Sequence, residues 1–329
     1  MNKPKFKVIF LLVIMIFLAM MGYFWTSLFN SKEVNLKQDD STGEALVSEE
    51  EAEPITEEAQ EVQEVEQNSF TNIAYDSYKD WERLLEEYNY NINQELVEIP
   101  RVKVEKFPED IGEISDVAKK KKIFLSIILI GAYHVNQDLI EDRRRLQSIA
   151  KQYSISDKIG LEDEEWLNQL KKEYSVKSDD LQESLDLLLV KVDIIPLSLV
   201  LAQAACESGW GTSRFTRVAN NIFGEWTFSK MVAGVVPKDR PVNATYKIRK
   251  FDTIEESIKS YINNLNSHYA YEELWKIRAN LREREERLDS LKLAEGLLNY
   301  SQRRELYIDE LRDIIKYNNL QKLDSLLEE

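Results

Sequence analysis

The sequence predicts a mainly helical protein with one small β lobe, preceded by a hydrophobic N-terminal segment. Apolar residues recur with a helical period through most of the chain after residue 70, which indicates packed helices. Residues 229–251 instead combine Val, Tyr and Ile with Pro and Gly, and residues 244–251 alternate as a strand does. With 329 residues and 43% hydrophobic composition, the chain is long enough to bury a sizeable core.

The composition argues against several classes of function. The net charge of −16 is the opposite of the basic face that nucleic-acid binding requires, so we expect no nucleic-acid partner. A single cysteine, Cys206, excludes an intrachain disulfide and a cysteine-rich metal site. With only His134 and His268 as histidines, a histidine-based metal centre is not expected either. We therefore predict no metal and no cofactor.

Residues 1–30 have the features of a transmembrane anchor. Residues 8–25 carry no charge, and Lys3, Lys5 and Lys7 precede them. Eighteen residues nearly span a bilayer core of about 30 Å, and the lysines favour a cytoplasmic N-terminus. A cleaved signal peptide is the alternative, but its apolar core is ordinarily shorter. In either case the rest of the chain is exported. An anchor would hold it at the cytoplasmic (inner) membrane, with the part after the anchor outside, on the periplasmic side.

Residues 31–69 are predicted to form a disordered acidic linker. Residues 31–68 contain 13 Asp and Glu but two Lys, which accounts for most of the net charge. Such a segment buries too little apolar surface to offset its ordering entropy. Residues 70–190 are then expected to form a helical N-terminal region of the exported part. Its longest helix covers 116–151, and the centre of that helix, 123–133, is apolar on all sides, as in a buried core helix.

The most informative segment is a helix that ends in a carboxylate. Residues 197–206 have helical spacing, with Asp193 as a candidate cap and Pro196 in the first turn. Gly209 is the expected end, which places Glu207 in the last turn. The helix C-terminus and nearby aromatic surface both disfavour ionisation, so this carboxyl suits a proton donor. A purely structural alternative is that Glu207 pairs with Arg214 or Arg217.

Aromatic and amide residues follow Glu207 closely. Trp210, Phe223 and Trp226 are candidates to stack on sugar rings, and Asn221 is a candidate to hydrogen-bond an N-acetyl group. The alternatives are that the rings fill the core and that the amide secures a loop. Acidic residues near the β lobe are few, with Glu225 and Asp239 as those before Asp252.

The pattern AQAACESGWGTSRFTRVANNIFGEW resembles the glucosaminidase family of peptidoglycan hydrolases, glycoside hydrolase family 73, most closely its Bax-protein branch. The resemblance implies a lysozyme-like fold over residues 191–329, with a helical core, a small β-hairpin lobe and a cleft between them. It implies that Glu207 is the catalytic acid and that a tyrosine of the run YSQRRELYIDEL, Tyr300 or Tyr307, reaches the cleft. In many relatives the β lobe supplies a second acid, and here Asn243, Ala244, Thr245 and Tyr246 occupy that strand.

Together these features predict a membrane-anchored endo-β-N-acetylglucosaminidase that acts on the glycan strands of peptidoglycan. The absence of an obvious second carboxylate leaves open assistance by the acetamido group of the substrate. A lytic transglycosylase and a non-catalytic peptidoglycan-binding scaffold are the alternatives.

Overall fold

The computed structural model describes residues 70–94, 98–238, 240–241 and 243–327. The predicted anchor at 1–30 and the predicted linker at 31–69 lie outside the described residues. The described residues form one compact unit. Its α-helices are α3 (Tyr78–Glu87), α4 (Val117–Ser156), α5 (Leu161–Glu173), α6 (Leu181–Lys191), α7 (Leu197–Ser208), α8 (Arg214–Ala219), α9 (Ile254–Ser267), α10 (Glu272–Glu283), α11 (Ser290–Leu293) and α12 (Glu305–Tyr317).

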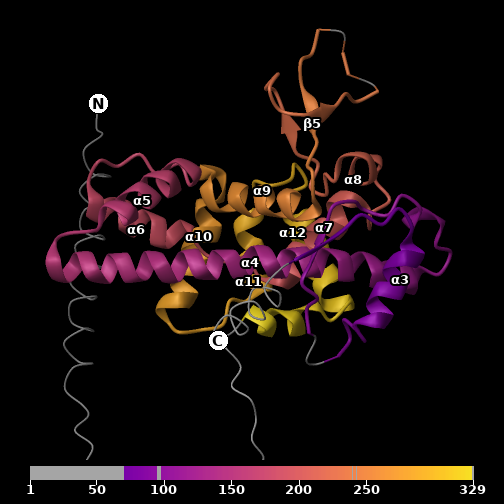
Figure 1. Cartoon of the computed structure of the whole chain (residues 1–329), viewed down its shortest axis with the longest axis horizontal. Helices are drawn as coiled ribbons and strands as arrows, with labels where there is room; N and C mark the ends of the chain where they lie inside the picture. The colour runs from indigo at the N-terminus through magenta and orange to yellow at the C-terminus, as the bar shows by residue number, and fades with distance from the viewer. Residues whose placement is uncertain (1–69, 95–97, 239, 242, 328–329) are drawn as a thin grey trace, which may run out of the picture. The chain divides into compact units, whose positions relative to one another are not determined.

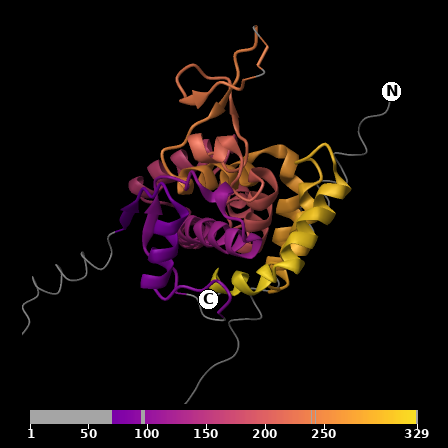
Figure 2. The ribbon, with the colours of Figure 1, turned by 90° about the vertical axis from the view of Figure 1, so that its right-hand side faces the viewer.

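Helix α4 is the axis of the helical body. Asp116 caps its first turn by accepting hydrogen bonds from the backbone N–H groups of Ala118 and Lys119. In the part of the chain that is described, α4 is the helix with the length and hydropathy of a membrane span, but 72% of its apolar window is buried. It packs against α7 and α9, and Figure 2 looks along it with other helices around it. The expectation of a buried core helix is confirmed.

Two small sheets complete the fold. The parallel pair β1 (Thr71–Ile73) and β2 (Val102–Val104) lies over α4 and α9. The β lobe has the strand order β3-β5-β4, formed by β3 (Trp226–Thr227), β4 (Gly234–Val235) and β5 (Lys247–Arg249), all antiparallel. The lobe projects from the helical body in both views (Figures 1 and 2). The predicted mainly α, lysozyme-like fold with a small β lobe is confirmed.

The predicted division of the exported part at residue 190 stays a prediction. Helix α4 belongs to the region 70–190, while its partners α7 and α9 belong to the region 191–329. The buried side chains of both regions contribute to one hydrophobic core. Residues 191–329 therefore rest on α4, and any shortened chain would have to keep that helix.

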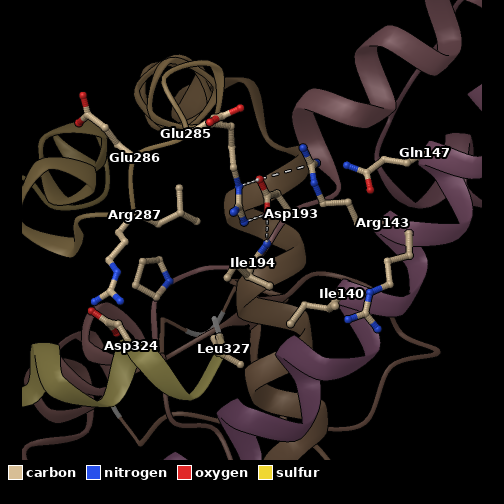
Figure 3. A pocket seen from close by; sticks show the side chains of 14 residues that line it. Ile140, Arg143, Gln147, Asp193, Ile194, Glu285, Glu286, Arg287, Asp324 and Leu327 are labelled. Atoms are coloured by element: carbon tan, nitrogen blue, oxygen red, sulfur yellow. Dashed lines mark hydrogen bonds and ion pairs between the residues drawn. The ribbon is translucent and has the colours of Figure 1, made fainter. Parts of the chain in front are cut away.

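The start of α7 is held by a buried ion cluster around Asp193 (Figure 3). The side chain of Asp193 is 2% exposed and accepts hydrogen bonds from Arg282 at 2.8 and 3.1 Å. Arg143 and the fully buried Arg278 approach the same carboxylate at 3.6 and 3.8 Å. The prediction that Asp193 caps α7 is therefore wrong, and Pro196 occupies the cap position without a side-chain bond.

Three guanidinium groups around one carboxylate leave an excess of positive charge, which the end of α6 offsets. Arg278 donates to the carbonyls of Val190 and Lys191, and Arg143 donates to those of Leu189 and Val192. These are the carbonyls of a helix C-terminus, which carry partial negative charge. The cluster borders a water-accessible pocket of about 580 Å³ (Figure 3). Helices α4, α6 and α10 are thus joined at the residues that lead into α7.

Replacing Asp193 with Asn should lower the free energy of unfolding by about 3–5 kcal/mol, because buried cations lose their counter-charge. Burial opposes ionisation of Asp193, but Arg278, Arg282 and Arg143 outweigh it and lower the pKa. The stabilisation that the ionised Asp193 gives the folded state is fully present above the ordinary Asp pKa of about 3.9. It is lost as the pH falls through the lowered pKa of Asp193 in the folded state. Urea unfolding at neutral and acidic pH measures it, with the exposed Asp179→Asn as control. Equal stability of the two variants at neutral pH would contradict the assigned role.

Candidate active site

The end of α7 delivers Glu207 to the surface of an otherwise buried helix. All residues from Leu197 to Ala205 are buried, and the small side chains of Ala202, Ala204 and Ala205 allow neighbouring backbones to approach closely. The helix ends at Gly209, whose φ of 57° is a left-handed conformation that glycine adopts without strain. The Ser208 hydroxyl fixes this turn by bonding the Ala204 carbonyl and accepting from the Gly211 N–H. The predicted helix and its predicted end are confirmed.

The carboxyl group of Glu207 is in an environment that favours its protonated form. The residue is open to solvent on one side, but protein atoms surround the carboxyl group, and this burial raises its pKa. The hydrogen bond from Tyr307 and the charge of Arg303 act in the opposite direction, while Glu310 adds to the rise. Arg303 is itself bound to Glu310 at 2.5 Å, which weakens its effect on Glu207. The net result is a pKa above the ordinary value for glutamate.

A chain of hydrogen bonds fixes the orientation of Glu207. The Tyr261 hydroxyl donates to Oε1 of Gln203, and Nε2 of Gln203 donates to the Tyr307 oxygen at 3.1 Å. Since the Tyr307 oxygen accepts from Gln203, its own proton goes to Oε1 of Glu207 at 2.7 Å. The second carboxyl oxygen of Glu207 is then the one that can hold a transferable proton.

Glu207 borders a pocket of about 540 Å³ between the helical body and the β lobe. The predicted site residues Phe223, Trp226 and Tyr300 line the same pocket. The other residues of its wall come from α9, the segment after it and the loop before β3, and they are Glu225, Ser260, Asn263, Asn264, Ser267 and Tyr271. The fold therefore brings two carboxyl groups whose pKa is raised by burial, those of Glu207 and Glu225, together with polar and aromatic side chains.

Aromatic rings form two groups around the pocket. In the floor, Phe223 stacks on Tyr261 with ring centroids 3.8 Å apart, and Tyr300 stacks on the buried Tyr307 at 5.5 Å. On the β lobe, Trp226 lies 4.4 Å from the Tyr246 ring and keeps 55% of its surface exposed. The floor rings support the site, whereas the exposed face of Trp226 is open to a ligand.

Two predicted ligand contacts have other roles in the structure. Asn221 is buried, and its side chain bonds the Glu225 N–H, the Glu225 carbonyl and the Arg249 carbonyl, which uses its donors and acceptor internally. The loop-securing alternative is therefore the one that its geometry supports. Trp210 does not line the Glu207 pocket, because its left-handed backbone, with φ of 58°, turns it toward Phe124 and Lys121. It lies instead in a neighbouring groove with Arg303 and Tyr317.

Several residues of the site were not predicted from the sequence. Gln203 and Tyr261 connect to Glu207 only through the hydrogen-bonded chain, and Tyr246 pairs with Trp226 across the lobe. Glu225 was noted as a nearby acid but was not assigned to the site. Its position beside Trp226, a candidate ligand contact, was the one signal that could have indicated it. Over the described ranges, no group of three or more His, Cys, Asp or Glu side chains is arranged to hold a metal ion.

The chain is similar to known proteins. The family described as mannosyl-glycoprotein endo-β-N-acetylglucosaminidase matches residues 182–320, which contain α7, the β lobe and α12. Protein bax of Escherichia coli (strain K12) is 32% identical over 207 residues, or 60% of this chain and 69% of that protein. The catalytic domain of the autolysin Auto from Listeria monocytogenes is 18% identical over 54% of this chain and 96% of that domain, with a TM-score of 0.31. The chain belongs to the glucosaminidase family of peptidoglycan hydrolases, glycoside hydrolase family 73, in its Bax-protein branch.

Proposed function

We propose that this protein is an exported, membrane-anchored endo-β-N-acetylglucosaminidase that cleaves the glycan strands of peptidoglycan with Glu207 as general acid. The observation that carries the proposal is the carboxyl group of Glu207, which has a raised pKa and lies at the edge of an aromatic-lined pocket. Membership of a glycoside hydrolase family supports the reaction class.

In the proposed reaction, Glu207 donates its proton to the glycosidic oxygen as the bond to the anomeric carbon breaks. Oε1 of Glu207 is held by the Tyr307 hydroxyl, so the proton leaves from the other oxygen. The raised pKa increases the fraction of Glu207 that carries a proton before the transfer. After the transfer the same tyrosine hydrogen bond stabilises the new carboxylate. This is the role of the acid carboxyl in glycoside hydrolysis.

The pocket walls suit a polymeric sugar substrate. The exposed face of Trp226, backed by Tyr246, provides an apolar platform for the C–H face of a sugar ring. Asn263 and Asn264 of α9 present amide groups to the same pocket, where they can bond hydroxyl or N-acetyl groups. Because Glu207 is exposed to solvent, a long glycan strand can reach it, as an endo-acting enzyme requires.

The proposed location follows from the N-terminal sequence. The uncharged residues 8–25 would anchor the chain in the cytoplasmic membrane, and residues 31–69 would tether the enzyme on the extracytoplasmic side. An acidic tether self-repels and extends, which would let the enzyme reach glycan strands at a distance from the bilayer. Residues 191–329, supported by α4, would carry out the reaction.

The substitution Glu207→Gln should lower kcat about 10²–10⁴-fold, because the amide has the shape of the acid but no proton to donate. The assay is digestion of purified peptidoglycan by the full-length protein, with mass spectrometry of the products. Reducing N-acetylglucosamine ends are expected from the wild type. Anhydro-muramyl ends would instead identify a lytic transglycosylase, and turnover near that of the wild type in the variant would exclude Glu207 as the acid.

Replacing Tyr307 with Phe should move the alkaline limb of the pH–kcat/KM profile to higher pH. The Tyr307 hydrogen bond lowers the pKa of Glu207, so its removal leaves burial less opposed and raises that pKa further. The alkaline limb marks the loss of the acid's proton and follows the same direction. Tyr269→Phe, at an exposed ring, is the matched control and should leave the profile unchanged. A shift to lower pH in Tyr307→Phe would contradict this arrangement.

Replacing Trp226 with Ala should raise KM about tenfold while changing kcat less, since a stacking contact of roughly 1.5 kcal/mol is lost. Steady-state kinetics on soluble glycan fragments measure both constants. Met231→Ala removes a side chain of the same lobe that is 94% exposed and makes a suitable control. An unchanged KM in Trp226→Ala would show that the lobe does not bind substrate through this ring.

A further inference from the structure

A second groove runs along α12 beside the pocket of Glu207. It is lined by Lys121 of α4, by Trp210 and by residues of α12, and its volume is about 990 Å³. The wall on α12 is formed by side chains that recur every three or four residues, namely Leu306, Asp309, Glu310, Asp313, Ile314 and Tyr317. At a rise of 1.5 Å per residue this wall is about 16 Å long, which is about the length of five extended residues.

Arg303 links this groove to the catalytic acid. It lines the groove, and its guanidinium bonds Glu310 at 2.5 Å and approaches the sulfur of Cys206 at 3.7 Å. Cys206 is the neighbour of Glu207 at the end of α7. The same guanidinium lies 5.6 Å from the centre of the Tyr307 ring, whose hydroxyl bonds Glu207 at 2.7 Å. The groove therefore begins close enough to Glu207 for a side branch of a bound strand to enter it.

Ionic groups of both signs border the groove without pairing. Asp309 and Asp313 are exposed one turn apart on α12, and neither forms an ion pair within the described residues. Like charges at this spacing repel, so they do not stabilise the helix. The ammonium of Lys121 lies 4.3 Å from the centre of the Trp210 ring and 5.2 Å from that of Tyr317. Because ring faces and not a carboxylate hold it, this ammonium can bind an anion.

The residue types of the groove fit a peptide better than a sugar. Sugar rings carry hydroxyl and acetamido groups, which are uncharged and require no ionic partner. A short peptide with free amino and carboxyl groups carries both signs of charge, with aliphatic side chains between them. Leu306 and Tyr317 keep 70% and 85% of their surfaces exposed, which offers apolar contact between the charges. Peptidoglycan strands, the proposed substrate, bear short peptide branches of this kind.

We infer that this groove binds the peptide branch of a strand whose glycan is cleaved at Glu207, so that the enzyme prefers glycan that carries peptide. This inference rests on the proposed function. A free ammonium group of the branch binds between Asp309 and Asp313, and a carboxylate of the branch binds Lys121. The groove thus recognises the branch, while the pocket of Glu207 holds the sugar at which cleavage occurs.

The test compares kcat/KM of the full-length protein on soluble peptidoglycan fragments with its value on the same strands after enzymatic removal of the peptides. We expect a higher value with peptide, and a preference that weakens as salt screens the charges. The double variant Asp309→Asn/Asp313→Asn should reduce the preference about three- to tenfold, through KM for the peptide-bearing fragments. Glu164→Gln/Glu165→Gln, which removes two exposed acids of α5, is the matched control and should keep the wild-type preference.

The double variant loses a repulsion within α12, so it should fold, and thermal unfolding verifies this. Equal kcat/KM of the wild type on both substrates, or an unchanged preference in the folded Asp309→Asn/Asp313→Asn variant, would overturn the inference and leave the proposed function intact.

Anhydro-muramyl ends, or no cleavage of either substrate, would contradict the proposed function instead. Isothermal titration calorimetry of Glu207→Gln with the two substrates then tests the groove by itself. Tighter binding of the peptide-bearing fragments would support the inference, and equal binding of both would overturn it.

Discussion

The buried carboxylate of Asp193 is the interaction on which the rest of the structure depends. It holds the arginines of α4 and α10 together, and those arginines bind the terminal carbonyls of α6. The segment that follows Asp193 begins α7, so the direction of the central helix is set at this cluster. Because α7 is buried along its length, its far end is the place where a residue of this helix reaches the surface, and Glu207 occupies that end.

The placement of Glu207 explains how one helix supplies both stability and chemistry. The alanine-rich face of α7 packs closely against α4 and α12, which brings protein atoms around one side of the last turn. This partial burial raises the pKa of the carboxyl group, and Tyr307 of α12 limits that rise while fixing the orientation of the side chain. Substitutions in the core of α7 should therefore affect the acid as well as the fold.

Local signals in the sequence were sufficient for much of this architecture. The helical period located α4 and α7, and Gly209 marked the end of α7 because a left-handed residue is needed there. The prediction of Asp193 as a cap was wrong because its partners, Arg278 and Arg282, lie about ninety residues further along the chain and form no local pattern. The strands of the β lobe proved shorter than the alternation indicated.

The site was predictable to the extent that it depends on α7 and on the loop after α8. Glu207, Phe223, Trp226 and Tyr300 do meet in one pocket. The backbone at Trp210 is left-handed and turns its ring into another groove, and a pattern of residue types contains no information on that torsion. Asn221 was predicted to contact the ligand but secures the loop that carries Glu225. Hydrogen bonds between distant segments, such as that from Tyr307 to Glu207, become visible only in three dimensions.

The most direct test of the central claim is a ¹³C NMR titration of the Glu207 carboxyl group in the full-length protein, assigned by comparison with Glu207→Gln. The account predicts a pKa clearly above the value of about 4.3 for an unperturbed glutamate, with the shift caused by burial at the end of α7. A pKa at or below that value would mean that the group is ionised at neutral pH. It would then lack the proton that cleavage requires, and the account would be contradicted.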